Sequence, residues 1–137
     1  MNWLKQFLSS IFRKISPEQP KLSPLGTVLP KECVSHFIFE KSHIFPDGTP
    51  KPAAFRPWKK TGNISIYRVN NLFDREIWGI AEKYIDSDRR KVIARVDLLA
   101  FHYYQLNLKF EPDGIPHPRH ANVIGWPPFE VGFCSRA

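Results

Sequence analysis

This 137-residue sequence lacks most of the patterns that carry chemistry or cross-link a fold. It has two cysteines, Cys33 and Cys134, and neither stands in a C-x-x-C pair or at a zinc-ligand spacing from histidine. It also has no Gly-rich phosphate loop, nucleophile elbow or paired-carboxylate motif. The sequence therefore predicts no disulfide framework, no metal site and no cofactor, and it leaves open whether the protein is an enzyme.

Long hydrophobic runs are missing as well. No window approaches the roughly 18 consecutive apolar residues of a membrane-spanning helix, and no small-residue cleavage site of a secretory signal follows the N-terminus. With so few cysteines, these absences favour a reducing cytoplasm in which both thiols are free. The length predicts a single domain, and the 42% apolar content excludes a fully disordered chain.

Positive charge is in excess, with a net charge of +7. Residues 1–31 carry five Lys and Arg against one Glu, a net +4, and residues 32–137 carry 15 basic against 12 acidic side chains, a net +3. An excess of this kind favours a polyanionic partner, either nucleic acid or an acidic membrane surface. Because more than half of it lies in the first quarter of the chain, the N-terminus is the first place to look for such a contact.

The first 16 residues, called the leader below, have the pattern of an amphipathic helix with only positive charges on its polar face. Its apolar stripe consists of Trp3, Leu4, Phe7, Leu8, Ile11, Phe12 and Ile15. So short a helix is marginal alone in water and needs a surface to dock on, which can be another protein, an anionic membrane or its own domain. Residues 17–31 are Pro-rich and predict an extended linker, which favours an external partner.

Residues 32–137 are predicted to form one compact α+β domain. Alternating or β-branched segments predict strands at 33–41, 63–69, 91–96 and 107–111. Helical spacing predicts a helix over 72–85 with Asn71 as its N-cap, and a shorter helix follows Asp97 as N-cap. The expected fold is a small single domain with a short mixed or antiparallel sheet and two to three helices, preceded by the amphipathic helix.

The HPRH corner, residues 117–120, is the sharpest candidate for chemistry. The prolines on either side of His117 fix φ and hold the segment stiff and non-helical. His117, Arg119 and His120 are the parts of phosphodiester chemistry, namely a general base, a general acid and a guanidinium that holds a phosphate. The structural alternative is that these side chains satisfy backbone groups that a Pro-rich loop leaves unpaired.

The longer segment HPRHANVIGWPP, residues 117–128, resembles a segment of small bacterial proteins of uncharacterised function that share a compact domain ending in this way. The resemblance extends over residues 52–128, is densest at 117–127 and does not include the leader. It implies that these residues belong to one domain type, and it attaches no activity to them.

A basic and aromatic loop, PAAFRPWKK at residues 52–60, is a candidate for contact with nucleic acid. Cations interleaved with aromatic rings can hold phosphates while the rings stack on bases. The alternative is that the charges are an ordinary solvated surface and the rings point into the core. Together with the DRRK segment, the candidate contact residues are Arg56, Trp58, Lys59, Lys60, Arg89, Arg90 and Lys91.

These patterns favour a non-enzymatic cytoplasmic adaptor or accessory module that binds a macromolecular partner, with the amphipathic helix as a docking element. A protein partner is the first expectation, and nucleic acid and a membrane surface are the others. Two alternative functions stay open. One is a His-dependent phosphodiesterase or nuclease acting on nucleic acid, and the other is a peripheral membrane protein.

Overall fold

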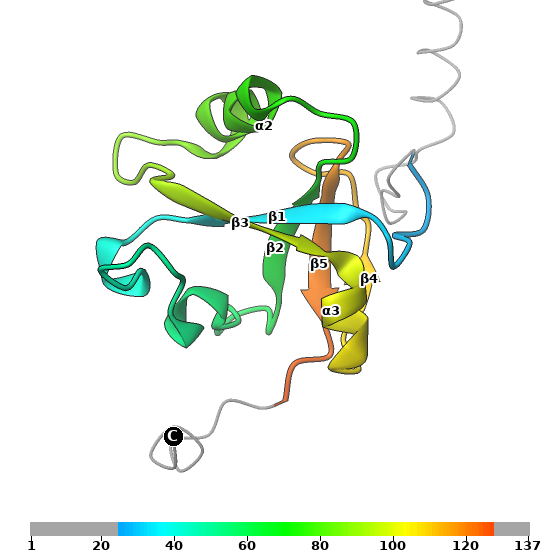
Figure 1. Ribbon diagram of the computed structural model, residues 1–137. Helices are drawn as coiled ribbons and strands as arrows, with labels where there is room; N and C mark the ends of the chain where they lie inside the picture. The colour runs from blue at the N-terminus through cyan, green and yellow to red at the C-terminus, as the bar shows by residue number, and fades with distance from the viewer. Residues whose placement is uncertain (1–24, 128–137) are drawn as a thin grey trace, which may run out of the picture.

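A computed structural model describes residues 25–127, which form a five-stranded antiparallel sheet in the order β3-β1-β2-β5-β4 (Figure 1). The strands are β1 (Cys33–Ile38), β2 (Ile64–Arg68), β3 (Ala94–Leu99), β4 (Lys109–Glu111) and β5 (His120–Ile124), and the α-helices are α2 (Asp74–Ile80) and α3 (Ala100–Gln105). A π-helix, η3 (Ala81–Ile85), continues α2. The α+β class is confirmed. The leader and the linker up to residue 24 lie outside the described residues. Within residues 25–127 no helix is long and apolar enough to cross a membrane.

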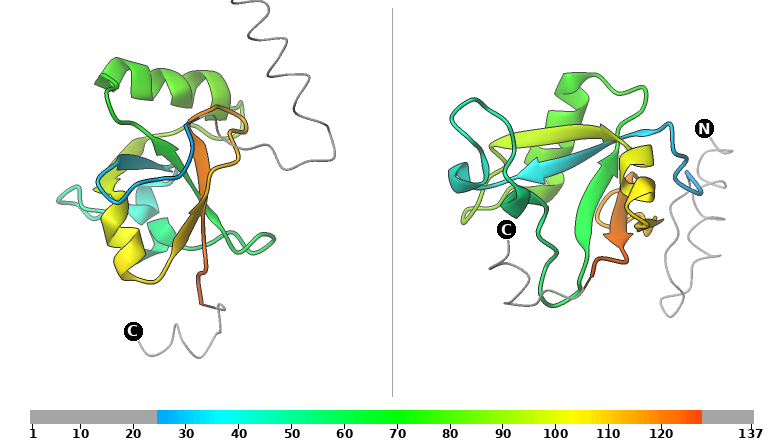
Figure 2. Two further views of the ribbon diagram at one scale, coloured as in Figure 1. Left: turned by 90° about the vertical axis from the view of Figure 1, so that its right-hand side faces the viewer. Right: turned by 60° about the horizontal axis from the view of Figure 1, so that its bottom comes forward.

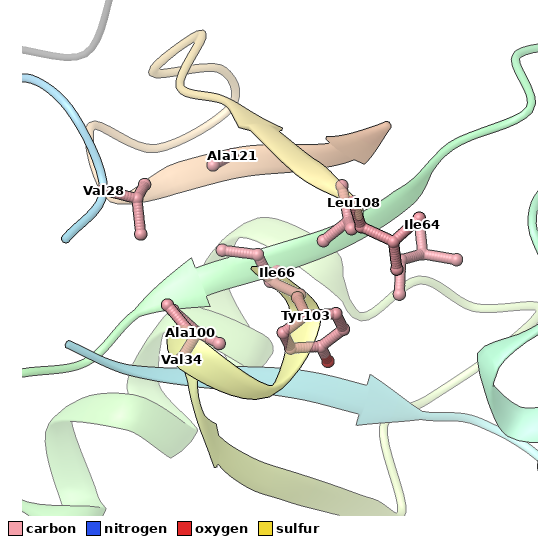
Figure 3. Packing of buried hydrophobic residues seen from close by; sticks show 9 residues of the cluster. Val28, Val34, Ile64, Ile66, Ala100, Tyr103, Leu108 and Ala121 are labelled. Carbon is pink, nitrogen blue, oxygen red and sulfur yellow. The ribbon is translucent and has the colours of Figure 1, made fainter. Parts of the chain in front are cut away.

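Both faces of the sheet are covered. Successive side chains along each strand point to opposite sides, so the strands supply apolar side chains to both faces. One face packs against α3, and its buried side chains are Val28, Val34, Ile64, Ile66, Ala100, Tyr103, Leu108, Ala121 and Val123 (Figure 3). The other face packs against α2, and its buried side chains are Phe37, Tyr67, Val69, Ile77, Ile80 and Ala81. The two helices therefore lie on opposite sides of the sheet (Figure 2).

The folded body begins before Glu32, the residue at which the sequence predicts its start. Val28 is 2% exposed and lies in the core beneath α3. The buried guanidinium of Arg68 holds the residues just before it, donating to the carbonyl oxygen of Gly26 at 2.5 Å and to that of Thr27 at 3.0 Å. The last residues of the predicted linker are thus part of the domain.

Each of the four predicted strands overlaps an observed one, but both predicted helix caps are wrong. Asn71 adopts a positive φ of 63° in the preceding turn, and α2 begins after Phe73, whose N–H donates to the Glu76 carboxylate at 3.0 Å. Asp97 lies inside β3 rather than at the start of a helix. Its carboxylate accepts the hydroxyl of the fully buried Ser35 at 2.5 Å, so it satisfies a core donor instead of helix amides.

β5 is the element that sequence reasoning does not predict, since it identifies only a stiff, non-helical corner at residues 117–120. The structure places this strand in the interior of the sheet, between β2 and β4. Tyr67 of β2 lies opposite His120, and Ile64 lies opposite Val123. The corner is therefore not a free loop, because it leads directly into an interior strand of the sheet.

Candidate functional site

The HPRH corner is fixed to the end of β2 by backbone hydrogen bonds. The N–H of Arg68 donates to the carbonyl oxygen of Arg119 at 2.9 Å, which extends the ladder between β2 and β5. Within the corner, the N–H of His120 donates to the carbonyl oxygen of His117 at 2.9 Å. These bonds set the directions in which the three candidate side chains leave the backbone.

His120 is 5% exposed and pairs with a carboxylate. Its Nδ1–H donates to Oδ1 of Asp113 at 2.5 Å, and the amide of Asn122 donates to Oδ2 of the same carboxylate at 3.0 Å. The His120 ring also meets the ring of Tyr67 edge to face, with centroids 5.2 Å apart. Burial, followed by the negative charge of Asp113, raises the pKa of Tyr67 to about 12, so its phenol stays neutral.

Among residues 25–127, the Nε2 atom of His120 has no hydrogen-bond partner. It is not fully buried, since the Tyr103 hydroxyl is the one fully buried side-chain N or O atom of these residues that lacks a partner. In a neutral ring, a carboxylate on Nδ1 selects the tautomer in which Nε2 carries the lone pair. This is the one atom of the corner that could accept a proton from a ligand.

Arg119 is committed to the protein backbone. Its guanidinium donates to the carbonyl oxygens of Arg68 at 3.0 Å and of Asn70 at 3.3 Å, both just at the end of β2. A guanidinium held by two carbonyl groups closes a gap in backbone pairing, which is the structural role that a Pro-rich loop calls for. The arrangement therefore favours a framework role for Arg119 over phosphate binding.

The His117 side chain makes contacts different from those of His120 and Arg119. Its Nδ1 accepts the N–H of Arg119 at 3.1 Å, and its ring meets Tyr84 edge to face at 4.9 Å. Burial, followed by the positive charges of Arg119 and Lys83, lowers the pKa of His117 below its ordinary value of 6.5. The neutral ring is thus the form that fits this place.

Acidification should therefore destabilise the protein through His117. Because the folded state holds this proton less tightly, the unfolded state takes it up first, and the free energy of unfolding falls as the pH drops below about 6.5. Replacing His117 by glutamine should make the loss of stability between about pH 7.5 and pH 5 smaller than in the wild type. Urea unfolding at several pH values measures this, and parallel curves for the two proteins would contradict the assignment.

The three candidate catalytic side chains thus have different surroundings: His120 bonds Asp113, Arg119 bonds two carbonyl groups, and His117 accepts an amide. Among residues 25–127 no three His, Cys, Asp or Glu side chains gather closely enough to hold a metal ion. Asp113 and Asn122, which sequence reasoning did not select, are the groups that orient His120. Their signal in the sequence is weak, because the pairing depends on a turn and a strand that the sequence did not reveal.

The second candidate site lies at one end of the sheet, where β1 ends, β3 begins and β2 starts. Two loops, residues 39–62 and 86–93, border this end and are called the basic end below (Figure 1). They carry eight Lys and Arg against four Asp and Glu, a net charge of +4. Residues 25–127 as a whole carry 15 against 11, also a net +4, so the rest of the described body is neutral.

The two aromatic residues of the PAAFRPWKK loop point in opposite directions. Phe55 packs against the core beneath α3 and stacks on the ring of His36, with centroids 5.2 Å apart. His36 Nε2 also lies 2.6 Å from the carbonyl oxygen of Ala54, which ties this short 3₁₀ segment to β1. Trp58, by contrast, is 64% exposed, and the ammonium of Lys60 lies 5.8 Å from its ring centroid.

The other basic segment meets the first through an aromatic contact. The guanidinium of Arg90 stacks on the ring of Phe39, 3.6 Å from its centroid, so this cation joins the two loops of the basic end. Arg89 and Lys91 on either side of it are exposed, as are Lys59 and Lys60 in the first loop. The predicted nucleic-acid residues thus form two groups, one in the turn before β2 and one in the loop before β3, and the contact of Arg90 with Phe39 links the two loops.

Comparison with known proteins finds no match to this chain among family models, curated proteins or solved structures. The resemblance of residues 52–128 to small bacterial proteins therefore stays a prediction, and the geometry of the two candidate sites is the basis for any functional conclusion.

Proposed function

We propose that this protein is a non-enzymatic cytoplasmic accessory module that binds nucleic acid through its basic end. The observation that carries the proposal is the distribution of charge, because the whole net positive charge of residues 25–127 lies in the two loops at that end. A localised excess of Lys and Arg attracts the phosphate backbone and releases its counterions. An exposed tryptophan in the same loops adds a surface for stacking.

The geometry of the HPRH corner does not favour catalysis, which supports the non-enzymatic part of the proposal. Phosphodiester cleavage needs an acid, a base and a phosphate-holding cation that converge on one atom. Arg119 uses its guanidinium on two backbone carbonyl groups, and the Nδ1 of His117 accepts a backbone amide. Two of the three groups are therefore engaged in holding the loop.

The test compares two variants that lose the same charge from different places. The basic-end variant replaces four exposed cations by alanine: Lys59, Lys60, Arg89 and Lys91. The matched control replaces four exposed cations elsewhere on the body by alanine: Lys31, Arg75, Lys83 and Lys109. Arg90 is left intact in both because its contact with Phe39 is structural.

Fluorescence anisotropy with labelled DNA and RNA oligonucleotides should show binding by the full chain at about 50 mM salt. The basic-end variant should bind at least roughly tenfold more weakly, and the slope of log affinity against log salt should fall by about 0.7 for each phosphate of a single strand that is no longer neutralised. The matched control should keep most of the affinity. Equal weakening in both variants would mean that only total charge matters, and no binding by the wild type would refute the proposal.

The same samples decide the second candidate, a His-dependent nuclease, which the unpartnered Nε2 of His120 favours. If the oligonucleotides are cleaved with Mg²⁺ or Zn²⁺ present, and cleavage is abolished in His120→Ala while the fold is kept, the corner is a catalytic site. Intact oligonucleotides under all these conditions would remove that candidate.

The leader is the second contact in this proposal, and its residues lie outside the described part of the chain. A chain that starts at residue 17 keeps the basic end, so it should retain nucleic-acid binding if that end is the binding site. It should at the same time lose any partner protein that the apolar stripe of the leader recruits. Loss of nucleic-acid binding with the leader would move the site away from the body.

A further inference from the structure

Trp58 is presented to solvent by a turn that is closed on itself. Its N–H donates to the carbonyl oxygen of Asn63 at 3.0 Å, and its own carbonyl oxygen accepts the amides of Thr61 at 3.2 Å and Gly62 at 2.7 Å. Gly62 has a φ of +70°, which glycine adopts without strain and which lets the chain turn back into β2. The exposed ring is thus carried by an ordered turn rather than by a loose tail.

The Trp58 ring has a cation beside it, Lys60, and most of its surface faces solvent. The neighbouring ring, Phe55, is partly buried, packs against the core and stacks on the ring of His36. An indole exposed to 64% loses the hydrophobic stabilisation that burial would give it. Its position next to the exposed Lys59 and Lys60 suits a flat apolar ligand that also carries negative charge.

The architecture of the basic end does not suit the grooves of a duplex. Reading the major groove normally takes an α-helix or a two-stranded ribbon inserted into it. The helical segments at this end are 3₁₀ turns of three residues (Lys41–His43) and four residues (Pro52–Phe55), and both α-helices lie on the faces of the sheet. A base can stack on an indole only where its face is open, as in a single strand.

From the exposed indole, its closed turn and the flanking cations we infer that the ligand of the basic end is single-stranded nucleic acid, with a base stacked on Trp58 and phosphates on Lys59 and Lys60. The inference rests on the proposed function and narrows its ligand class. It makes Trp58 a binding residue whose contribution is separate from that of the charges.

The experiment uses the full chain with two labelled probes of the same sequence, a single strand of roughly 16 nucleotides and its blunt duplex, because single-strand binding folds cover up to about that length. Trp58→Ala should weaken binding to the single strand by about tenfold or more and leave binding to the duplex nearly unchanged. Trp58→Phe should recover most of the affinity, since a ring is restored. Phe73→Ala is the matched control, because Phe73 is 66% exposed and also lies beneath a cation, Arg75, but stands at the start of α2.

The outcomes separate this inference from the proposed function. If neither probe binds the wild type, both fail. If both probes bind and Trp58→Ala changes neither affinity, or changes both equally, the basic end binds phosphates without stacking and the inference is overturned while the function stands. Thermal unfolding of each variant should match the wild type, because both substituted rings lie outside the core.

Discussion

Replacing Arg68 by methionine is expected to lower the free energy of unfolding by about 3–5 kcal/mol, the cost of leaving one partner of a buried ion pair alone. The guanidinium of Arg68 donates to both carboxylate oxygens of Glu32, each at 2.8 Å, and their side chains are 4% and 12% exposed. The same guanidinium also holds the carbonyl oxygens of Gly26 and Thr27. One side chain therefore joins the start of the body to the centre of the sheet.

Urea unfolding followed by circular dichroism measures this destabilisation. Arg75→Met, at an exposed position on α2, is the matched control and should change stability by less than about 0.5 kcal/mol. The double variant Glu32→Leu with Arg68→Met should be more stable than Arg68→Met alone, because it no longer buries an unpaired carboxylate. A single variant as stable as the wild type would show that the pair does not hold the body together.

The pH dependence should report the same pair. Burial alone would raise the pKa of Glu32, but the hydrogen bond and charge of Arg68 outweigh it and the pKa is lowered from its ordinary value of 4.5. As the pH falls below that value the unfolded state binds the proton first, so wild-type stability decreases. In Arg68→Met only the N–H of Leu29 and the charge of Arg119 still oppose the effect of burial on the pKa of Glu32, so the loss of stability at acid pH should become smaller than in the wild type.

Sequence reasoning predicted the parts of this fold whose signal is local. β1, β2 and the helix α2 follow from alternation and helical spacing, because each buries a face that its own residues define. The pattern of PAAFRPWKK also indicated aromatic and basic groups together. The pattern does not predict that Phe55 packs inward while Trp58 is exposed, because the position of Phe55 depends on its contact with His36 in β1.

The parts that sequence reasoning missed depend on pairing between distant segments. β5 is short and follows a proline-containing corner, so its own residues give little strand signal, and its place beside β2 is set by the register that puts Tyr67 opposite His120. The predicted cap Asp97 is another case, since Ser35, which it bonds, is 62 residues away in the sequence. Side-chain roles in this protein are thus decided by the sheet order, which no local pattern contains.

This dependence on sheet order also explains why the corner looks catalytic in the sequence and structural in the fold. Two histidines and an arginine within four residues suggest that their side chains converge on one site. Successive side chains of a strand, however, point to opposite faces of the sheet, and the side chains of the turn before it point in other directions. His120 enters the face beneath α2, while Arg119 reaches along the end of β2. The group that decides the geometry of the corner is Asp113, since it bonds both His120 and Asn122.

Replacing Asp113 by alanine is therefore expected to lower the free energy of unfolding by about 3 kcal/mol, since hydrogen bonds to a charged group contribute about 1.5–3 kcal/mol each and a buried donor is left unpaired. The carboxylate also accepts the N–H of Ile115 at 3.2 Å, so its removal loosens the turn that leads into β5. Asp88→Ala, at an exposed acidic residue in the loop before β3, is the matched control and should leave stability within about 0.5 kcal/mol of the wild type.

A double-mutant cycle then separates framework from chemistry at the corner. If Asp113 serves mainly to satisfy the buried imidazole, Asp113→Ala and His120→Ala together should cost less than the sum of the single effects, with a coupling of about 1.5 kcal/mol or more. Nucleic-acid binding through Trp58, Lys59 and Lys60 should remain unchanged in all three variants, because the corner is bonded to the end of β2 at Arg68, whereas these residues lie before the start of that strand at Ile64. Additive effects on stability, combined with abolition of a cleavage activity in both single variants, would instead identify Asp113 and His120 as a catalytic pair.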